Sequence, residues 1–200
     1  NPLTDGSYYK KVSRHLDKAE IKLKAKDPNA KASINGLAEE LTSSAKVVEL
    51  DLSNEIINIP LKIVAEDGTT HEVNLKLERE SNDTSLARVL EGTNELTNVN
   101  DTYTVTVDSK VTSIDFTAIP THENAKVKRA EDTEYSSTLS GIDVNIGSID
   151  SFDIVVMAED NETTKTYTIL INRTYDASIK KLDVDSEEVI SETTAYEKFV

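Results

Sequence analysis

The feature that most constrains this chain is an internal repeat with a period of about 93 residues. The segment Ala65–Thr70, AEDGTT, returns 93 residues later as AEDNETT at Ala158–Thr164. An apolar run precedes each copy, and an alternating segment follows each, ending at Arg79 and at Arg173, where the shift is 94. A fixed period of this length predicts several copies of one folding unit in series.

Other landmarks keep the same order in both copies. Ile21–Ala25 matches Ile114–Ala118, and Asp83–Leu86 matches Asp176–Ile179, each at a shift of 93. The chain therefore holds two full periods and an overlap. We predict three segments: a first β-sandwich repeat over 1–82, with 83–97 as its possible completion; a second over 83–175; and over 176–200 either the start of a third repeat or a strand completing the second.

Within each copy the dominant period is two, which is the pattern of half-buried strands. The clearest cases are the apolar residues of Tyr103–Val107, Ile114–Ala118 and Tyr167–Ile171, and Ile154–Ala158 is apolar throughout, as in a central strand. Short strands bounded by Asn, Asp, Gly and Pro are typical of sandwiches. The predicted fold class is all-β, with two tandem immunoglobulin-like antiparallel β-sandwich domains.

Three local features refine this expectation. The Glu66-Asp67-Gly68 segment and its second copy have the residues of a tight hairpin turn. Residues 36–46 carry near-helical apolar spacing and form either one short helix or a loop. Pro60 interrupts a strand pattern, so it must lie at a strand start, an edge or a bulge, because proline donates no ladder hydrogen bond.

The ends of the chain leave two alternatives open. If repeats begin at Asp83, the first copy lacks its opening strand and the third consists only of 176–200. We expect a shifted physical unit, in which 83–96 completes the first sandwich and 176–190 completes the second, with a short junction near 80–83. The alternative is that the tail 177–200 fills the vacant strand position of a neighbouring molecule by β-augmentation.

Charge excludes several classes of partner. The chain has 22 Lys and Arg against 37 Asp and Glu, a net charge of −15, which repels phosphate backbones and anionic lipid headgroups. It has no Cys, and no apolar run approaches the about 18 residues of a membrane-spanning helix. We expect no nucleic-acid partner and no membrane insertion, and the Asn1-Pro2-Leu3 opening reads as that of a fragment excised from a longer protein.

Signatures of chemistry are missing from the sequence. His15, His71 and His122 are isolated, and there is no nucleophile elbow or phosphate-binding glycine loop. Clustered carboxylates could bind calcium, but the acidic run over 183–188 has no counterpart 93 residues earlier. The repeated Glu66-Asp67 pair is more simply explained as a turn former that also adds solubility than as a calcium ligand. We predict no enzyme activity, no catalytic, cofactor-binding or metal residues and no cofactor.

Three further candidates have simpler explanations. The tandem Tyr8-Tyr9 would place one ring inward and one outward on a strand, so it is a weak sugar platform. Lys31 and Lys126 recur between apolar neighbours and should face solvent, which argues against an isopeptide crosslink. Four Asn-x-Thr triplets, at Asn82, Asn100, Asn161 and Asn172, are expected from composition.

The order of these motifs resembles that of the cadherin-like β-sandwich repeats of bacterial secreted and surface proteins. The resemblance rests on Tyr103–Val107, Asn124–Val127, Ala158–Asp160 and Tyr167–Arg173. It departs from the family pattern in keeping only Gly92 of a glycine-rich stretch after the first strand. The resemblance implies sandwiches strung in arrays, without an activity of their own, and it assigns no functional residues.

Together these observations predict a non-catalytic structural or spacer module of an extracellular or cell-surface protein. The alternative is an adhesion or ligand-binding module that uses loops differing between copies, residues 36–46 against 130–139. The expected partners are neighbouring domains of the same parent chain, with a surface protein or a glycan as the partner in the alternative.

Overall fold

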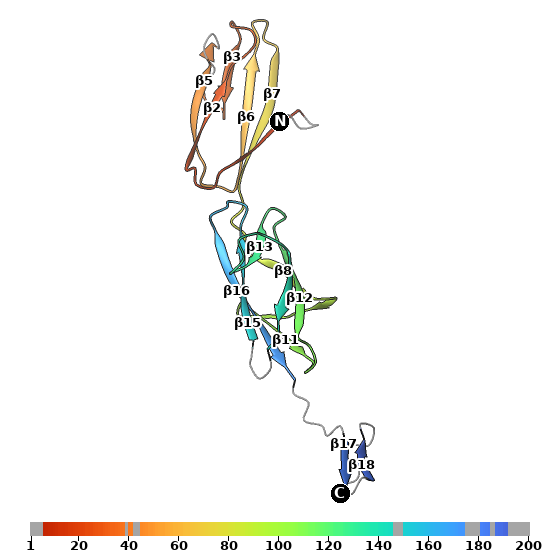
Figure 1. The fold of residues 1–200 in the computed structure, drawn as a ribbon. Helices are drawn as coiled ribbons and strands as arrows, with labels where there is room; N and C mark the ends of the chain where they lie inside the picture. Colours follow the sequence, from red (N-terminus) through yellow and green to blue (C-terminus); the bar gives the residue numbers. More distant parts are fainter. Residues whose placement is uncertain are drawn as a thin grey trace. The chain divides into compact units, whose positions relative to one another are not determined.

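A computed structural model describes residues 6–38, 40–41, 45–145, 150–174, 181–184 and 187–191, with side chains through residue 174 apart from that of residue 41. The described residues form strands, turns and loops, with no α-helix among them, so the all-β prediction is confirmed. No described segment forms a helix that is long and apolar enough to cross a membrane. Figure 1 shows the strands in sequence colours.

The chain divides into two compact units. The first takes in Asn1–Ser85 with two short later segments, His122–Ala125 and Met157–Thr164. The second takes in the rest, Leu86–Thr121, Lys126–Val156 and Lys165–Val200.

The first unit is a sandwich of two sheets. Its strands are β1 (Tyr8–Val12), β2 (Lys18–Leu23), β3 (Lys31–Ile34), β4 (Glu40–Leu41), β5 (Lys46–Asp51), β6 (Ile56–Val64) and β7 (Thr70–Arg79). A five-stranded sheet has the order β1-β7-β6-β3-β4, and β2 pairs with β5 in a second sheet. The fully buried Ile34, Leu52 and Ile59 form a core against which residues of both sheets pack, including Ile21 and Leu50.

The second unit repeats this arrangement with more strands. They are β8 (Leu86–Glu91), β9 (Asn94–Glu95), β10 (Asn98–Val99), β11 (Thr102–Val107), β12 (Ser113–Pro120), β13 (Lys126–Arg129), β14 (Thr138–Asp143), β15 (Asp150–Met157) and β16 (Thr164–Arg173). One sheet has the order β10-β11-β16-β15-β13 and the other β14-β12-β8-β9. Phe116 of β12 and Phe152 of β15 lie 5.6 Å apart between ring centroids, so the two sheets face each other across the core. The central position expected for 154–158 is confirmed, because β15 lies between β16 and β13.

The residues that alternate at period two in the sequence are alternately buried and exposed in the strands. One strand pairing in each unit, however, is parallel and so differs from the antiparallel prediction. Tyr103, Val105 and Val107 of β11 are buried while the residues between them are exposed. However, β1 pairs with β7 in parallel, and β11 pairs with β16 in parallel, so neither five-stranded sheet is wholly antiparallel. Parallel neighbours need a long connection, and here the whole of each repeat lies between the paired strands.

Backbone hydrogen bonds show that the first half of the repeat is offset by 95 residues. Leu52 N donates to Asp17 O in the first unit, and Val144 N donates to Thr112 O at the same place in the second, so the acceptors Asp17 and Thr112 in the first half of the repeat are 95 residues apart. The closing arginines agree, since Arg79 donates to the carbonyl of Arg14, and Arg173 donates to that of Ser109.

The match of Ile21–Ala25 to Ile114–Ala118 at 93 residues is therefore wrong by two positions. Ile21 corresponds to Phe116, and Leu23 corresponds to Ala118. A two-residue slip keeps every side chain on its original face of the strand, so the hydrophobic pattern could not reveal it.

Pro60 lies inside β6, beside the end of β3. The β3 ladder stops where Ile34 pairs with Leu61, and Pro60 O accepts a hydrogen bond of 2.8 Å from Asn35 N in the following turn. In an antiparallel strand the N–H and C=O of one residue point to the same side. The N–H that Pro60 lacks would therefore point to this turn, so its absence leaves the hydrogen bonds between β6 and β7 intact. The prediction of a strand start, an edge or a bulge is therefore wrong: Pro60 lies in the middle of β6, between β7 and β3, and is tolerated because the β3 ladder has ended there.

The expectation that 83–96 completes the first sandwich is wrong for its strand. β8 pairs with β12 in the second unit, with Val89 opposite Ala118, and Val89 is completely buried there. Burial of that apolar position outweighs proximity in sequence to the first unit. The domain limits 1–82, 83–175 and 176–200 and the junction near 80–83 stay predictions.

At the C-terminal end, β17 (Lys181–Val184) pairs with β18 (Glu187–Ser191) in a sheet of two strands, separate from the sheets of both units. The prediction that 176–190 completes the second sandwich thus finds no support in the described pairings, and residues 175–180, 185–186 and 192–200 lie outside the described ones. In the 36–46 segment the described residues form a turn and β4, and residues 39 and 42–44 likewise lie outside.

Candidate functional site

The two hairpin loops that carry the repeated Glu-Asp pair have the same turn chemistry. In the first copy, the Asp67 carboxylate accepts a 2.8 Å hydrogen bond from Thr69 N, and Gly68 adopts a positive φ of 84°. In the second, Asp160 accepts from Thr163 N at 2.8 Å, and Asn161 has a φ of 58°. Glycine and asparagine tolerate this conformation, so the turn prediction is confirmed.

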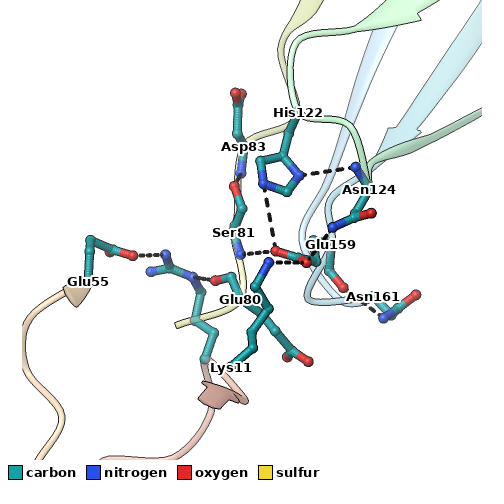
Figure 2. Close-up of polar contacts among 10 residues, drawn as sticks. Lys11, Glu55, Glu80, Ser81, Asp83, His122, Asn124, Glu159 and Asn161 are labelled. Atoms are coloured by element: carbon teal, nitrogen blue, oxygen red, sulfur yellow. Dashed lines mark hydrogen bonds and ion pairs between the residues drawn. The ribbon is translucent and has the colours of Figure 1, made fainter. Parts of the chain in front are cut away.

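Glu159 departs from its counterpart Glu66. Glu66 is exposed, whereas the Glu159 side chain keeps only 11% of its surface and accepts bonds from three donors. Lys11 Nζ lies 2.5 Å from its Oε1, Asn124 Nδ2 lies 2.8 Å from the same oxygen, and Ser81 N lies 2.9 Å from Oε2. His122 Nε2 stands 3.7 Å from Oε2. We call these five residues the Glu159 cluster; Figure 2 shows them converging on one carboxylate.

All members of the Glu159 cluster belong to the first compact unit, although they come from four places in the sequence. Lys11 is on β1, Ser81 follows β7, His122 and Asn124 precede β13, and Glu159 begins the turn after β15. The segment after β7 is held further by Asp160 N, which donates to Ser81 O at 3.1 Å. Arg14 also donates to Glu80 O at 2.8 Å and pairs with Glu55.

The electrostatics of the cluster favour the ionised carboxylate. Burial alone would raise the pKa of Glu159, but the hydrogen bonds from Lys11, Ser81 and Asn124 and the charge of Lys11 lower the pKa from 4.5 to about 2. The hydrogen bond to Glu159 correspondingly raises the pKa of Lys11. Burial likewise works against ionisation of Asp160, yet the bonds from Thr163 and Glu162 leave its pKa lowered.

This arrangement is suited to holding backbone segments together. Each oxygen of Glu159 already accepts a hydrogen bond from the protein, and the Lys11 ammonium neutralises the charge. The Ser81 hydroxyl accepts a 3.1 Å hydrogen bond from Asp83 N, and none of the contacts described above joins it to His122 or to Glu159 as a nucleophile to a general base. The Glu159 cluster is therefore suited to a structural role. Its hydrogen bonds fix the segment after β7 to two loops of the same unit.

The other sequence candidates are spread over the molecule. His71 and His15 are exposed, and His15 Nε2 lies 3.2 Å from Glu162 Oε2. Lys31 and Lys126 are exposed, as predicted. Tyr8 is 44% exposed and Tyr9 is half-buried, which agrees with the expected alternation on β1.

There is no obvious metal-binding site in the part of the chain that the structure describes. Within it, no three or more His, Cys, Asp or Glu side chains are grouped so as to hold an ion. The acidic run over 183–188 lies partly outside the described residues, and the structure describes none of its side chains. The absence of metal and cofactor residues stays a prediction.

The Glu159 cluster was not predicted from the sequence, because it does not recur in both copies of the repeat. Glu159 and Glu66 occupy the same place in the repeat, and only the partners that the fold brings to Glu159 distinguish them. His122 was likewise interpreted as an isolated surface residue. The sequence carries no signal for these contacts, which join residues up to 148 positions apart.

Comparison with known proteins bears on the second repeat. Residues 91–174 match the family model of the cadherin-like beta sandwich domain. This segment is therefore similar to cadherin-like β-sandwich domains. The resemblance inferred from its motifs is thereby confirmed, and the matched residues include β9 through β16.

Among solved structures, the chain is similar to extracellular cadherin domains 1–4 of protocadherin gamma B7, at 11% identity and a TM-score of 0.41, covering 85% of this chain and 49% of that one. It is similar to domains EC22–24 of mouse cadherin-23, at 11% identity and 0.41, covering 86% and 65%. The two immunoglobulin domains of DIP-gamma match at 6% identity and 0.44, covering 85% and 95%. The chain thus spans about half the length of the protocadherin chain that it matches. No curated protein sequence matches the chain.

Proposed function

We propose that the chain is a non-catalytic structural module, a spacer built of tandem cadherin-like sandwiches in an extracellular or cell-surface protein. The observation that supports this most directly is what the two copies share. The recurring contacts are backbone ladders, hairpin turns and the closing arginine, at Arg79 and Arg173, that donates to a carbonyl beside the parallel strand. Features kept between copies serve folding, and cadherin-like domains are generally non-enzymatic.

The Glu159 cluster fits the same role. Its contacts hold backbone segments of the first unit together, and Ser81 is hydrogen-bonded there through both its N–H and its C=O. The net charge of −15 adds solubility and discourages association with anionic surfaces.

Binding assays on the 200-residue chain test the proposal. A spacer is expected to show no saturable binding on a glycan array and to retain no surface protein in a pull-down. Saturable binding to one glycan class or one protein would replace the spacer function with adhesion. Antibodies against the chain should label intact cells of the source organism, and labelling only after permeabilisation would contradict the extracellular placement.

One observation favours the adhesion alternative. Tyr135, in the loop over 130–139, is 37% exposed, and Lys128 Nζ and Lys126 Nζ stand 5.6 and 6.0 Å from its ring centroid. An exposed ring beside two cations is suited to stacking on a sugar or an acidic ligand. If adhesion is the function, Tyr135→Ala should abolish binding while Tyr8→Ala, the same change at another exposed tyrosine, leaves it intact.

A further inference from the structure

The turn after β3 carries the one Asn-Gly pair of the sequence, Asn35-Gly36. Both residues have a positive φ, 53° for Asn35 and 71° for Gly36, as in a type I′ turn. Leu37 N closes the turn by donating to Ile34 O at 3.1 Å. Asn35 and Gly36 are both exposed, so the side-chain amide of Asn35 lies in solvent beside a residue that has no side chain to shield it.

The N–H of Gly36 is the chemically important group of this turn. Among the described residues, none accepts a hydrogen bond from it, because the bond that closes a β-turn is donated by the fourth residue and not by the third. A backbone nitrogen that follows an asparagine can attack the Cγ of that side chain and close a ring of five atoms. The space around the Gly36 Cα is open, so nothing obstructs this attack.

Two other asparagines share the left-handed backbone, but the N–H that follows each of them is already bonded. After Asn161, which has a φ of 58°, Glu162 N donates to Asp160 Oδ1 at 3.0 Å. The side-chain amide of Asn161 is also held, since it donates to a backbone carbonyl at 2.8 Å. After Asn100, which has a φ of 52°, Asp101 N donates to a side-chain oxygen at 3.0 Å.

The hairpin turn of the first unit gives a second contrast, because a glycine follows its aspartate. Gly68 N donates to Ala65 O at 3.0 Å, so this nitrogen is not available for attack. The hydrogen bonds from Thr69 lower the pKa of Asp67, and an ionised carboxylate is a poorer electrophile than an amide. Of these four turns, the one after β3 alone combines an amide, a following glycine and an unbonded N–H.

We propose that Asn35 is a site of spontaneous deamidation, a covalent modification that the chain performs on itself. The Gly36 nitrogen bonds to Asn35 Cγ, the Cγ–Nδ2 bond breaks, and the amide leaves as ammonia with the proton of the Gly36 N–H. Water then opens the resulting succinimide at one of its two carbonyls, which gives aspartate or isoaspartate. Water is the only co-reactant. The proposal goes beyond the spacer function, because it assigns a modification site.

The isoaspartate product changes the end of β3. Its backbone runs through Cβ and Cγ, so an extra carbon enters a turn that the Leu37–Ile34 hydrogen bond closes. Asn35 N also donates to Pro60 O at 2.8 Å, and the neighbouring Ile34 is completely buried. Each product adds one negative charge to the net −15 of the chain. Isoaspartate is therefore expected to weaken the attachment of β3 to β6, and aspartate is not.

Ageing of the folded 200-residue chain in mildly alkaline buffer, followed by tryptic digestion and mass spectrometry, tests the proposal. We expect the peptide 32–46 to gain the mass of an amide-to-acid conversion, with isoaspartate among the products. Its rate should exceed that of the peptides with Asn100 and Asn161 by at least about tenfold, because there a hydrogen bond must break before attack. Asn35→Asp should abolish the mass change. An Asn35 that stays unchanged while the chain in urea converts would overturn the proposal.

Glu162→Gly is the matched control, because it creates a second Asn-Gly pair at a left-handed asparagine whose following N–H is bonded to Asp160. In the folded chain this pair should convert at least about tenfold more slowly than Asn35, and in urea the two should convert at similar rates. Equal rates in the folded chain would overturn the role given to the unbonded N–H.

The consequence for β3 has its own measurement. Ion exchange separates the aged chain by its added charge, and the isoaspartate form should then unfold at a lower urea concentration than Asn35→Asp, which carries the same charge on a normal backbone. Equal urea midpoints would contradict the expected effect of the extra backbone carbon.

Discussion

At the scale of single residues, Glu159 shows how one position of a repeat acquires a role that its counterpart lacks. Both Glu159 and Glu66 precede the aspartate that forms the hairpin turn. Only Glu159 meets a lysine, an asparagine and a backbone N–H, so it becomes a buried anion with compensating donors. A buried carboxylate with such partners contributes to stability mainly because its removal leaves those partners unsatisfied.

Glu159→Gln is therefore expected to lower the free energy of unfolding of the first unit by about 1–3 kcal/mol. Urea denaturation followed by circular dichroism measures this. Glu66→Gln, the same change at the same place in the repeat, should change stability by less than about 0.5 kcal/mol, because the side chain is exposed. Equal effects of the two substitutions would contradict the role given to the Glu159 cluster.

The contribution of Glu159 should also depend on pH. Its pKa is lowered from 4.5 to about 2 in the folded protein, so the stabilisation is complete above pH 4.5 and is lost as the pH falls toward 2. The difference in unfolding free energy between the wild type and Glu159→Gln should narrow across this window. A difference that stays constant from pH 6 to pH 2.5 would show that the carboxylate is not the group responsible.

Calcium should have little effect on this chain. Asp160 already accepts bonds from Thr163 and Glu162, and Lys11 neutralises Glu159, so neither carboxylate offers free oxygens to a hard cation. Millimolar calcium should leave the Tm unchanged within a few degrees, as differential scanning calorimetry can measure. A larger rise would reveal a site that neither the sequence nor the described residues indicate.

At the scale of elements, the presence or absence of one strand decides how deeply its neighbours are buried. β8 covers β12, whereas β5 is the one described strand that pairs with β2. Identical substitutions on the two strands should thus have different costs. The cost of removing a side chain from a core follows the contacts that it loses.

The same truncation, isoleucine to alanine, can be made on both strands. Ile114→Ala on β12 removes a side chain that is 7% exposed and should cost about 2–5 kcal/mol. Ile21→Ala on β2 removes a half-buried side chain and should cost less than half as much. Urea denaturation compares them, and equal losses would argue against this difference in burial.

At the scale of the whole molecule, the second unit contains every strand that its two sheets need, from β8 through β16. A fragment of residues 83–175 is accordingly expected to fold alone and to unfold in a single cooperative transition in urea. Circular dichroism and amide exchange check this. A fragment without cooperative unfolding would show that the predicted repeat boundary cuts through a folding unit.

The sequence by itself determined the all-β class, the tandem repeat and most strand positions. Alternation of apolar and polar residues at period two indicates which side chains of a strand are buried. Asp, Asn and Gly indicate where the backbone turns. Both signals depend only on neighbouring residues, so they can be interpreted without knowledge of the fold. The cadherin-like resemblance rested on the same strand and turn motifs, and the family match to residues 91–174 agrees with it.

Only the tertiary structure decided the parallel pairing of β1 with β7 and β11 with β16, the 95-residue offset, the membership of β8 and the Glu159 cluster. A shift of two residues leaves the alternation of a strand unchanged, so the alternation could not reveal the 95-residue offset. The sequence pattern of a strand also does not indicate which other strand it pairs with. Lys11 and Glu159 are 148 residues apart, and nothing local to either residue distinguishes an ion-paired carboxylate from an exposed one. These features depend on which distant segments meet, and that is settled by the packing of the whole unit.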